Sequence, residues 1–340
     1  MKKIVIIVFG VLLFLALIIA GIGCYFVLSP NTTVKDDGII FIRPGDSFET
    51  VLITLQSKGY IKNENTFRRV AVLKDYPRAV KPGRYRIEEG WNNNQLVNIL
   101  RSGTQAPVHF TFNNIRTPKE FAGVVGQQLN IDSVRFLSLL NDADFCRQYG
   151  FTPQNFIGMF IPNTYQIYWN TQAEDFVKRM NREYKKFWNE NRVAKARKAN
   201  LSPMDVTIIA SIVEEETNQP QEYPVIAGVY VNRLKKGWKL EACPTLKFAL
   251  NDFTLKRVLD KHIETESPYN TYKYAGLPPG PVRMPSIQVI DAVLDYRHHD
   301  YMFFCAKSDF SGTHYFSRTL RQHNQYAAEY HRALNKRKIY

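Results

Sequence analysis

The feature that most constrains the fold is an uninterrupted apolar run at the start of the chain, from Ile4 to Val27. Its length of about 24 residues lets a helix cross the hydrocarbon core of a bilayer, which is about 30 Å thick. A cleavable signal peptide has an apolar core of only about 7–15 residues, so we expect a retained transmembrane helix over residues 4–27. Lys2 and Lys3 precede the run and favour a cytoplasmic N-terminus, residues 1–3. The rest of the chain is then expected outside that membrane.

The charge balance restricts the partners. The chain has 45 Lys and Arg against 31 Asp and Glu, a formal net charge of +14, which suits nucleic acid, anionic lipid or an anionic cell-wall polymer. No zinc-finger spacing, nucleotide-binding glycine loop or compact RNA-binding signature is present, so we do not expect nucleic acid as a partner. Cys24, Cys146, Cys243 and Cys305 lie far apart, without metal-ligand spacing. We predict no metal site and no disulfide framework. A single disulfide between two of these cysteines is left as an alternative.

The chain after the apolar run divides by composition into a polar linker, residues 28–38, and two folded parts. Residues 39–103 predict a small α+β module with the order strand (39–42), helix (47–59), strand (84–87) and helix (94–100). Its segments FIRPGDSFETVLITLQSKGYI and KPGRYRIEEG resemble a LysM-like module, and that resemblance implies peptidoglycan binding. A spacer domain that touches no glycan fits the same pattern.

Residues 104–340 predict a larger domain of mixed α+β structure. We expect strands at 108–112, 301–305 and 315–316, and helices at 118–129, 133–140, 223–234, 287–294 and from 320 onward. Residues 173–198 predict one long basic helix. Ser202 and Pro203 suit the cap and first turn of another helix. The segment 246–250 fits a helix or a strand, and 267–285 is a Pro/Gly-rich loop that carries several tyrosines.

The stretch Ile208–Thr217, IIASIVEEET, contains the candidate catalytic acid. Its apolar residues recur at helical spacing and predict a buried amphipathic helix. Glu216 lies four residues after Ile212, which places its carboxyl group on the apolar stripe, whereas Glu214 and Glu215 are expected to meet solvent. A desolvated carboxyl group has a raised pKa and keeps a proton that it can donate. Three consecutive glutamates also commonly form a solvated helix face.

Polar and aromatic residues gather in the segments that follow this helix. Tyr269 and Tyr272 offer flat faces for sugar rings, although tyrosines also serve ordinary packing. Asn232, Arg233 and Asn270 offer directional donors for hydroxyl and acetamido groups. These five residues are candidate substrate-binding residues.

Several motifs together carry a resemblance to a known family: IIASIVEEET, VYVNRL, PTLKFAL, SPYNTYKYAGLPPGPV and a terminal H-x-F…HN pattern. In this order they resemble the YceG-like endolytic murein transglycosylases. The resemblance implies internal cleavage of peptidoglycan glycan strands at the MurNAc–GlcNAc bond, without water or cofactor, leaving 1,6-anhydro-MurNAc ends. It also implies a bacterial inner (cytoplasmic) membrane protein with a periplasmic or other extracytoplasmic catalytic domain. It further implies that the enzyme terminates nascent strands near the penicillin-binding proteins that synthesise them.

The resemblance assigns the family's functional residues to individual positions of this chain. The family's catalytic Glu, which stands just before the motif Thr, falls on Glu216, and the other motif acid falls on Glu214, the second choice. The N-R pair falls on Asn232 and Arg233, and the Y-N-T-Y run on 269–272. The usual D-P-T reads Cys243-Pro244-Thr245, which loses a carboxylate but keeps Thr245 as an expected substrate-binding residue.

Two other functions fit the chain. A muramidase that hydrolyses the same bond needs a second carboxylate to activate water or act as nucleophile, and no such partner of Glu216 is evident in the sequence. A membrane-tethered scaffold would bind peptidoglycan without cleaving it. A Ser/His hydrolase is disfavoured because no nucleophile motif surrounds a serine near His314 or His323, and we expect His314 to be structural.

Overall fold

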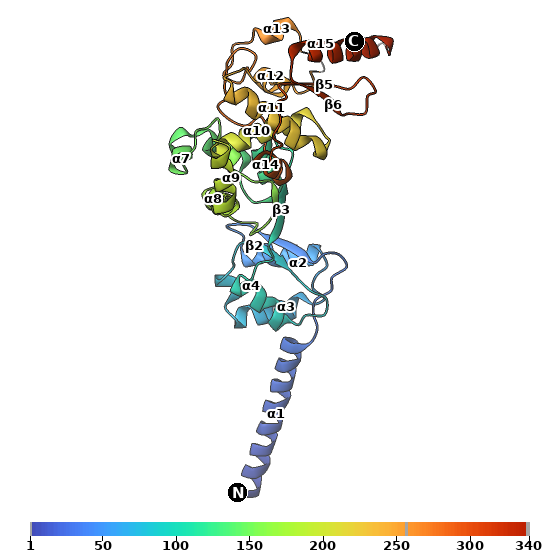
Figure 1. The fold of residues 1–340 in the computed structure, drawn as a ribbon. Coiled ribbons are helices and arrows are strands. Elements are labelled where there is room, and N and C mark those ends of the chain that lie inside the picture. The colour runs from blue at the N-terminus through green and yellow to red at the C-terminus, as the bar shows by residue number, and fades with distance from the viewer. Residues whose placement is uncertain (1, 256–257, 338–340) are drawn as a thin grey trace. The chain divides into compact units, whose positions relative to one another are not determined.

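The computed structural model describes residues 2–255 and 258–337, and it confirms a mixed α and β composition (Figure 1). The described chain divides into two compact units, one from the N-terminus to Phe110 with the segments Gln128–Asn130 and Tyr165–Thr171, the other made of the remaining residues. The strands β3 (Val108–Phe112) and β4 (Asn163–Ile167) pair in a two-stranded sheet, and each contributes residues to both units.

Helix α1 (Lys2–Leu28) begins the first unit. It is long and apolar enough to cross a membrane over Ile6–Leu28, and its large side chains are uncovered, for example Ile6 and Ile19, which are 69% and 70% exposed. Such a continuous apolar surface is stable only when lipid or protein covers it. The helix is therefore compatible with a single-pass membrane anchor.

The folded part of the first unit is built around a two-stranded antiparallel sheet. Strands β1 (Ile39–Ile42) and β2 (Gly83–Arg86) pair in the register that sets Ile39 opposite Arg86. Its helices are α2 (Phe48–Ser57), α3 (Glu64–Leu73) and α4 (Asn93–Ser102), with a 3-10 turn at Tyr76–Arg78. The predicted order of elements was wrong in omitting α3. The side chain of Asn63 caps this helix, and Phe67 and Val70 bury its inner face.

The second unit is mostly helical. Its helices and 3-10 turns are α5 (Pro118–Gln128), α6 (Ser133–Asn141), α7 (Ala143–Gln148), η2 (Phe156–Met159), α8 (Ala173–Phe187), α9 (Glu190–Lys198), α10 (Pro203–Glu216), η3 (Pro220–Glu222), α11 (Tyr223–Lys235), α12 (Cys243–Leu250), α13 (Asp260–Ile263), α14 (Ile287–Leu294) and α15 (Leu320–Lys336). Strands β5 (Phe303–Ala306) and β6 (His314–Ser317) form an antiparallel hairpin.

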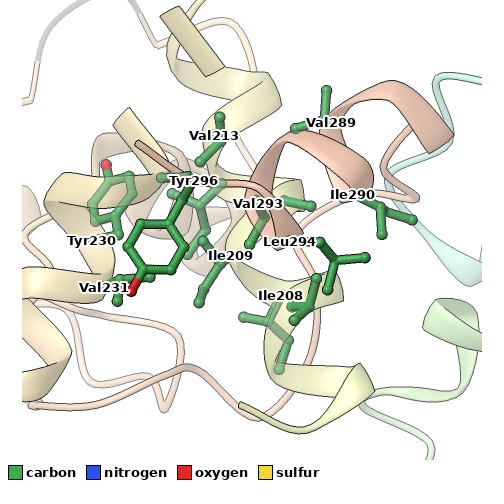
Figure 2. Close-up of a cluster of buried hydrophobic side chains, with 14 of the residues drawn as sticks. Ile208, Ile209, Val213, Tyr230, Val231, Val289, Ile290, Val293, Leu294 and Tyr296 are labelled. Carbon is green, nitrogen blue, oxygen red and sulfur yellow. The ribbon is translucent and has the colours of Figure 1, made fainter. Parts of the chain in front are cut away.

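The core of this unit lies between α10, α11 and α14, as Figure 2 shows. Ile209 and Val213 of α10 pack with Tyr230 of α11 and with Val289 and Val293 of α14. Every residue of α10 from 206 to 213 is buried, so the predicted buried helix is confirmed. The helix is enclosed on all sides there, so its predicted amphipathic character was wrong. Because other elements enclose this helix, the positions of its side chains are set by packing on every face.

The single basic helix predicted over residues 173–198 is also wrong. The chain breaks it into α8 and α9 at Trp188 and Asn189. The side chain of Asn189 accepts a hydrogen bond from the backbone N–H of Arg192, which starts a new helix, while Trp188 is buried in the core.

Candidate active site

Helix α10 presents the candidate acid because its two ends are well defined. At its start the Ser202 hydroxyl accepts from the Asp205 N–H while the Asp205 carboxylate accepts from the Ser202 N–H, and Pro203 occupies the first turn. This capping box satisfies backbone donors that the first helical turn leaves unpaired. Glu216 is the last helical residue, and Thr217 continues in extended conformation with φ −148°. The acid therefore lies where the helix opens into a loop.

A pocket of about 370 Å³ lies at this end of α10. Its lining comes from α10, α11, α12, the β5–β6 hairpin, α15 and intervening loops. The lining residues are Glu216, Tyr230, Arg233, Leu240, Glu241, Cys243, Tyr272, Phe303, Phe304, Cys305, Ala306, His314, Leu320 and His323. The pocket thus combines two acids, Glu216 and Glu241, with aromatic, basic and thiol side chains that lie far apart in the sequence.

The carboxyl group of Glu216 has one direct partner among the described residues. The hydroxyl of Tyr230 donates to its Oε1 over 2.7 Å. Burial raises the pKa of Glu216 above its ordinary value, outweighing the hydrogen bond from Tyr230 and the charges of His314, Lys247 and Arg233. A raised pKa keeps the carboxyl group protonated to higher pH, which is the state that a general acid requires.

The two neighbouring glutamates are not solvated as expected. Glu215 forms ion pairs with Arg116 at 2.9 Å and with Arg283 at 3.0 Å. Glu214, the second choice for the catalytic acid, lies 3.4 Å from Arg283 and accepts a hydrogen bond from the backbone N–H of Ser286. Their side chains are only 17% and 14% exposed. The expectation that they meet solvent was wrong, because basic side chains distant in sequence pack against them.

Two of the predicted substrate-binding residues line the pocket with Glu216. Arg233 is buried, and its guanidinium donates to the carbonyls of Met302 and Leu240 at 2.8 and 2.7 Å. The hydroxyl of Tyr272 lies 3.1 Å from the thiol of Cys243, and burial raises the pKa of both groups. These polar groups remain protonated at neutral pH inside the pocket.

The other four predicted substrate-binding residues do not line this pocket. Asn232 donates to the carbonyls of His299 and Tyr301, and Asn270 to those of Ile263 and Thr265.

Thr245 donates to the carbonyl of Ala242. Tyr269 lines a separate cavity of about 260 Å³, where its ring packs against Phe248 at 4.6 Å and its hydroxyl donates to the carbonyl of Gln154. In the structure these four residues hold the loops around the site, and their role toward substrate remains a prediction.

Four further polar residues of this region were not predicted as site residues, and one of them, His314, was expected to be structural. Glu222 accepts from Nδ1 and from the backbone N–H of His314. Glu241 pairs with Arg233 at 3.1 Å, and His323 stacks on Phe303. The terminal H-x-F…HN pattern contains both histidines, and it was the available signal for them. Nothing in the sequence joins Glu222 to His314, which lies 92 residues away.

Within residues 2–255 and 258–337, no group of three His, Cys, Asp or Glu side chains is arranged to hold a metal ion. The four cysteines are free thiols. Burial raises the pKa of Cys146 to about 11, so this thiol is unreactive in the core.

The sequence profile of the YceG-like family matches residues 40–329 of the chain. The chain belongs to the YceG-like family. It is 29% identical over 323 residues to the endolytic murein transglycosylase of Bacillus subtilis (strain 168), covering 90% of this chain and 87% of that protein. It is 26% identical to the endolytic murein transglycosylase of Streptococcus pneumoniae serotype 2 (strain D39), covering 95% of this chain and 65% of that longer protein. The crystal structure of a putative yceG-like protein from Listeria monocytogenes matches 84% of this chain and 98% of its own, with a TM-score of 0.56 and 25% identity.

Proposed function

We propose that this YceG-like protein is an endolytic murein transglycosylase, and that Glu216 is its catalytic acid and base. The observation that carries the proposal is the place of Glu216: a carboxyl group with a raised pKa, hydrogen-bonded to Tyr230, at the wall of a pocket large enough for part of a glycan. The family membership and the names of the Bacillus and Streptococcus relatives support the same reaction class.

In the proposed reaction Glu216 donates its proton to the glycosidic oxygen between MurNAc and GlcNAc as that bond breaks. Positive charge develops at the MurNAc anomeric carbon, as in other glycosidic cleavages. The 6-hydroxyl of the same sugar attacks this carbon and forms the 1,6-anhydro ring. Glu216, now a carboxylate, accepts the hydroxyl proton and returns to its starting state. No water is consumed, and every proton is accounted for.

The surroundings of Glu216 favour this route over hydrolysis. The other acid of the pocket, Glu241, is paired with Arg233. Glu222 is buried, with its carboxylate oxygens engaged by His314 and Thr217. A hydrolase of the usual kind needs a second free carboxylate for its nucleophile or its water. A single acid that acts twice is sufficient for the intramolecular reaction.

The remaining assignments belong to the same proposal. Helix α1 is a single-pass anchor with a cytoplasmic N-terminus, and the folded part lies on the extracytoplasmic face of the inner membrane. Residues 39–103 are a LysM-like module and 104–340 the catalytic domain. Cleavage terminates nascent strands, beside the penicillin-binding proteins that make them. The net charge of +14 suits an anionic wall polymer.

Mass spectrometry of the products tests the reaction. Full-length protein in detergent, incubated with uncrosslinked glycan strands, is expected to release internal fragments with anhydro ends, which lack one water relative to reducing ends. Glu216→Gln is expected to abolish these products, and Glu329→Gln, an exposed position on α15, to leave them unchanged. Fragments that all end in reducing sugars would indicate a muramidase. Binding of strands without any cleavage would indicate a scaffold.

A further inference from the structure

The buried carboxylate of Glu222, next to the pocket, contacts His314 through both of its oxygens. Oε1 of Glu222 accepts from the backbone N–H of His314 over 2.7 Å, and its Oε2 lies 2.8 Å from Nδ1 of the same residue. The hydroxyl of Thr217, the residue after Glu216, donates to Oε2 over 3.1 Å. Glu222 is only 7% exposed. It therefore ties the first residue of β6 to the end of α10 that bears the catalytic acid.

This contact determines which half of the imidazole is available to the pocket. Since a carboxylate accepts only, Nδ1 of His314 carries a proton. His314 lines the pocket with Glu216, and no hydrogen bond joins its Nε2 to any residue within 2–255 and 258–337. The ring of Phe304 packs against the imidazole in a T-shaped arrangement, with ring centroids 5.4 Å apart and ring planes at 87°. The orientation of the ring is thus held by a carboxylate on one side and an aromatic ring on another.

We propose that Glu222 and His314 are positioning residues for Glu216: Glu222 orients the imidazole through Nδ1, and the imidazolium form of His314 stabilises the carboxylate that Glu216 becomes after donating its proton. The inference rests on the proposed function. In this role His314 transfers no proton, so the proton balance of the reaction is unchanged. A buried carboxylate left in a dry pocket is costly unless a donor or a positive charge is in place before the reaction.

Apart from Lys247, the other ionisable groups around Glu216 are less suited to this task. Arg233 of α11 is already paired with Glu241 and with backbone carbonyls. Lys247 of α12 contributes a charge, and Cys243 and Tyr272 are neutral because burial raises the pKa of each. On α15, burial and the charge of Arg233 lower the pKa of His323, so it is neutral as well. The charge of His314 lowers the pKa of Glu216, and the carboxylate that pairs with His314, Glu222, does not line the pocket.

Two substitutions of His314 separate a role in the pocket from a role in the fold. In His314→Asn the amide nitrogen takes the place of Nδ1, so the contact with Glu222 is kept and the Nε2 half of the ring is lost. In His314→Gln the amide reaches the place of Nε2. We expect kcat to fall about 10- to 100-fold in His314→Asn with KM little changed, and His314→Gln to recover part of the loss. His331→Asn, an exposed histidine on α15, is the matched control and should be unchanged.

Titration of Glu216 by infrared spectroscopy gives a readout that does not depend on activity. The carboxyl band of Glu216 in the full-length protein is assigned by its absence in Glu216→Gln. Removal of the nearby charge is expected to raise the pKa of Glu216 in His314→Asn. The same upward shift is expected in Glu222→Gln, because the imidazolium of His314 loses the carboxylate that pairs with it. This variant keeps the shape of the Glu222 side chain, and it decides the question if His314→Asn does not fold.

The outcomes separate the two proposals. Folded His314→Asn and Glu222→Gln with wild-type kcat and wild-type titration of Glu216 would overturn the positioning role and leave the transglycosylase intact. A wild-type protein that forms no anhydro ends would overturn the proposed reaction. If, in addition, Glu216 titrated in both variants as it does in the wild type, the positioning role would be overturned too.

Discussion

The hydroxyl of Tyr230 on α11 donates to Oε1 of Glu216 on α10 over 2.7 Å, so one hydrogen bond joins two consecutive helices at the wall of the pocket. Burial raises the pKa of Tyr230 well above its ordinary value, and the nearby Glu216 raises it further. The phenol therefore keeps its proton and can only donate to an ionised Glu216. This geometry stabilises the carboxylate and leaves the other oxygen of Glu216 for the substrate.

Tyr230→Phe is expected to lower kcat by about tenfold or more, because the ionised form of Glu216 loses a preorganised donor. The fold should persist, since the ring still packs against Phe304, whose centroid lies 5.9 Å away. Steady-state kinetics on glycan strands, with a thermal unfolding curve for each variant, checks this. A wild-type kcat in folded Tyr230→Phe would show that the hydrogen bond serves only to join the helices.

Glu216→Gln is expected to stabilise the protein at neutral pH. The folded-state pKa of Glu216 is raised above 4.5, so above this pH the unfolded chain releases the proton while the folded protein still holds it. The free energy of unfolding then falls as pH rises, until the folded-state pKa is passed. Glutamine does not ionise and avoids this loss.

Thermal unfolding at about pH 4 and at neutral pH measures this effect. The Tm of Glu216→Gln should exceed that of the wild type only at neutral pH. Glu329→Gln, at an exposed position, should match the wild type at both pH values. An equal gain at both values would mean that ionisation of Glu216 is not the cause.

Arg283→Met is expected to destabilise the protein by about 3 kcal/mol, because two largely enclosed carboxylates lose a shared cation, and only Glu215 keeps another basic partner, Arg116. The side chains of Arg283, Glu214 and Glu215 are 13%, 14% and 17% exposed. Arg147→Met removes an ion pair with Asp144 in which the side chains are 73% and 84% exposed, and it should cost less than about 1 kcal/mol. Chemical denaturation of both variants measures the difference, and similar losses would contradict the structural account.

Asn232→Ala is expected to lower the free energy of unfolding by about 1–3 kcal/mol, because the carbonyls of His299 and Tyr301 lose their donor at 2.7 and 3.0 Å. KM for glycan strands should change little. A large rise in KM with unchanged stability would instead support the direct role toward substrate that the N-R motif predicts.

Gly280→Ala is expected to disturb the loop that follows Tyr272. A Cβ atom there would lie 1.9 Å from the carbonyl oxygen of Gln154, which is backbone and cannot move aside cheaply. Gly123→Ala on α5 is the matched control, since its Cβ meets nothing within 4 Å and alanine favours a helix by roughly 0.5–1 kcal/mol. Denaturation should therefore show a loss of stability at the first position and a gain at the second.

Local patterns were sufficient for many elements. Ser202 and Pro203 predicted the start of α10, and the strand predicted at 108–112 has the observed bounds of β3. The prediction of one long basic helix was wrong because charge composition does not reveal that Asn189 caps a second helix.

The sequence by itself determined the apolar helix, the mixed composition, the family and the place of Glu216 at the end of α10, because spacing along one helix and motif order are local properties. The tertiary structure decided which side chains surround that acid. Glu215 lies 99 residues from Arg116, and Glu222 lies 92 from His314, so neither pair leaves a periodic signal. Burial, the source of the raised pKa of Glu216, likewise depends on how α11, α12 and the β5–β6 hairpin close around it, and only packing of distant segments sets that.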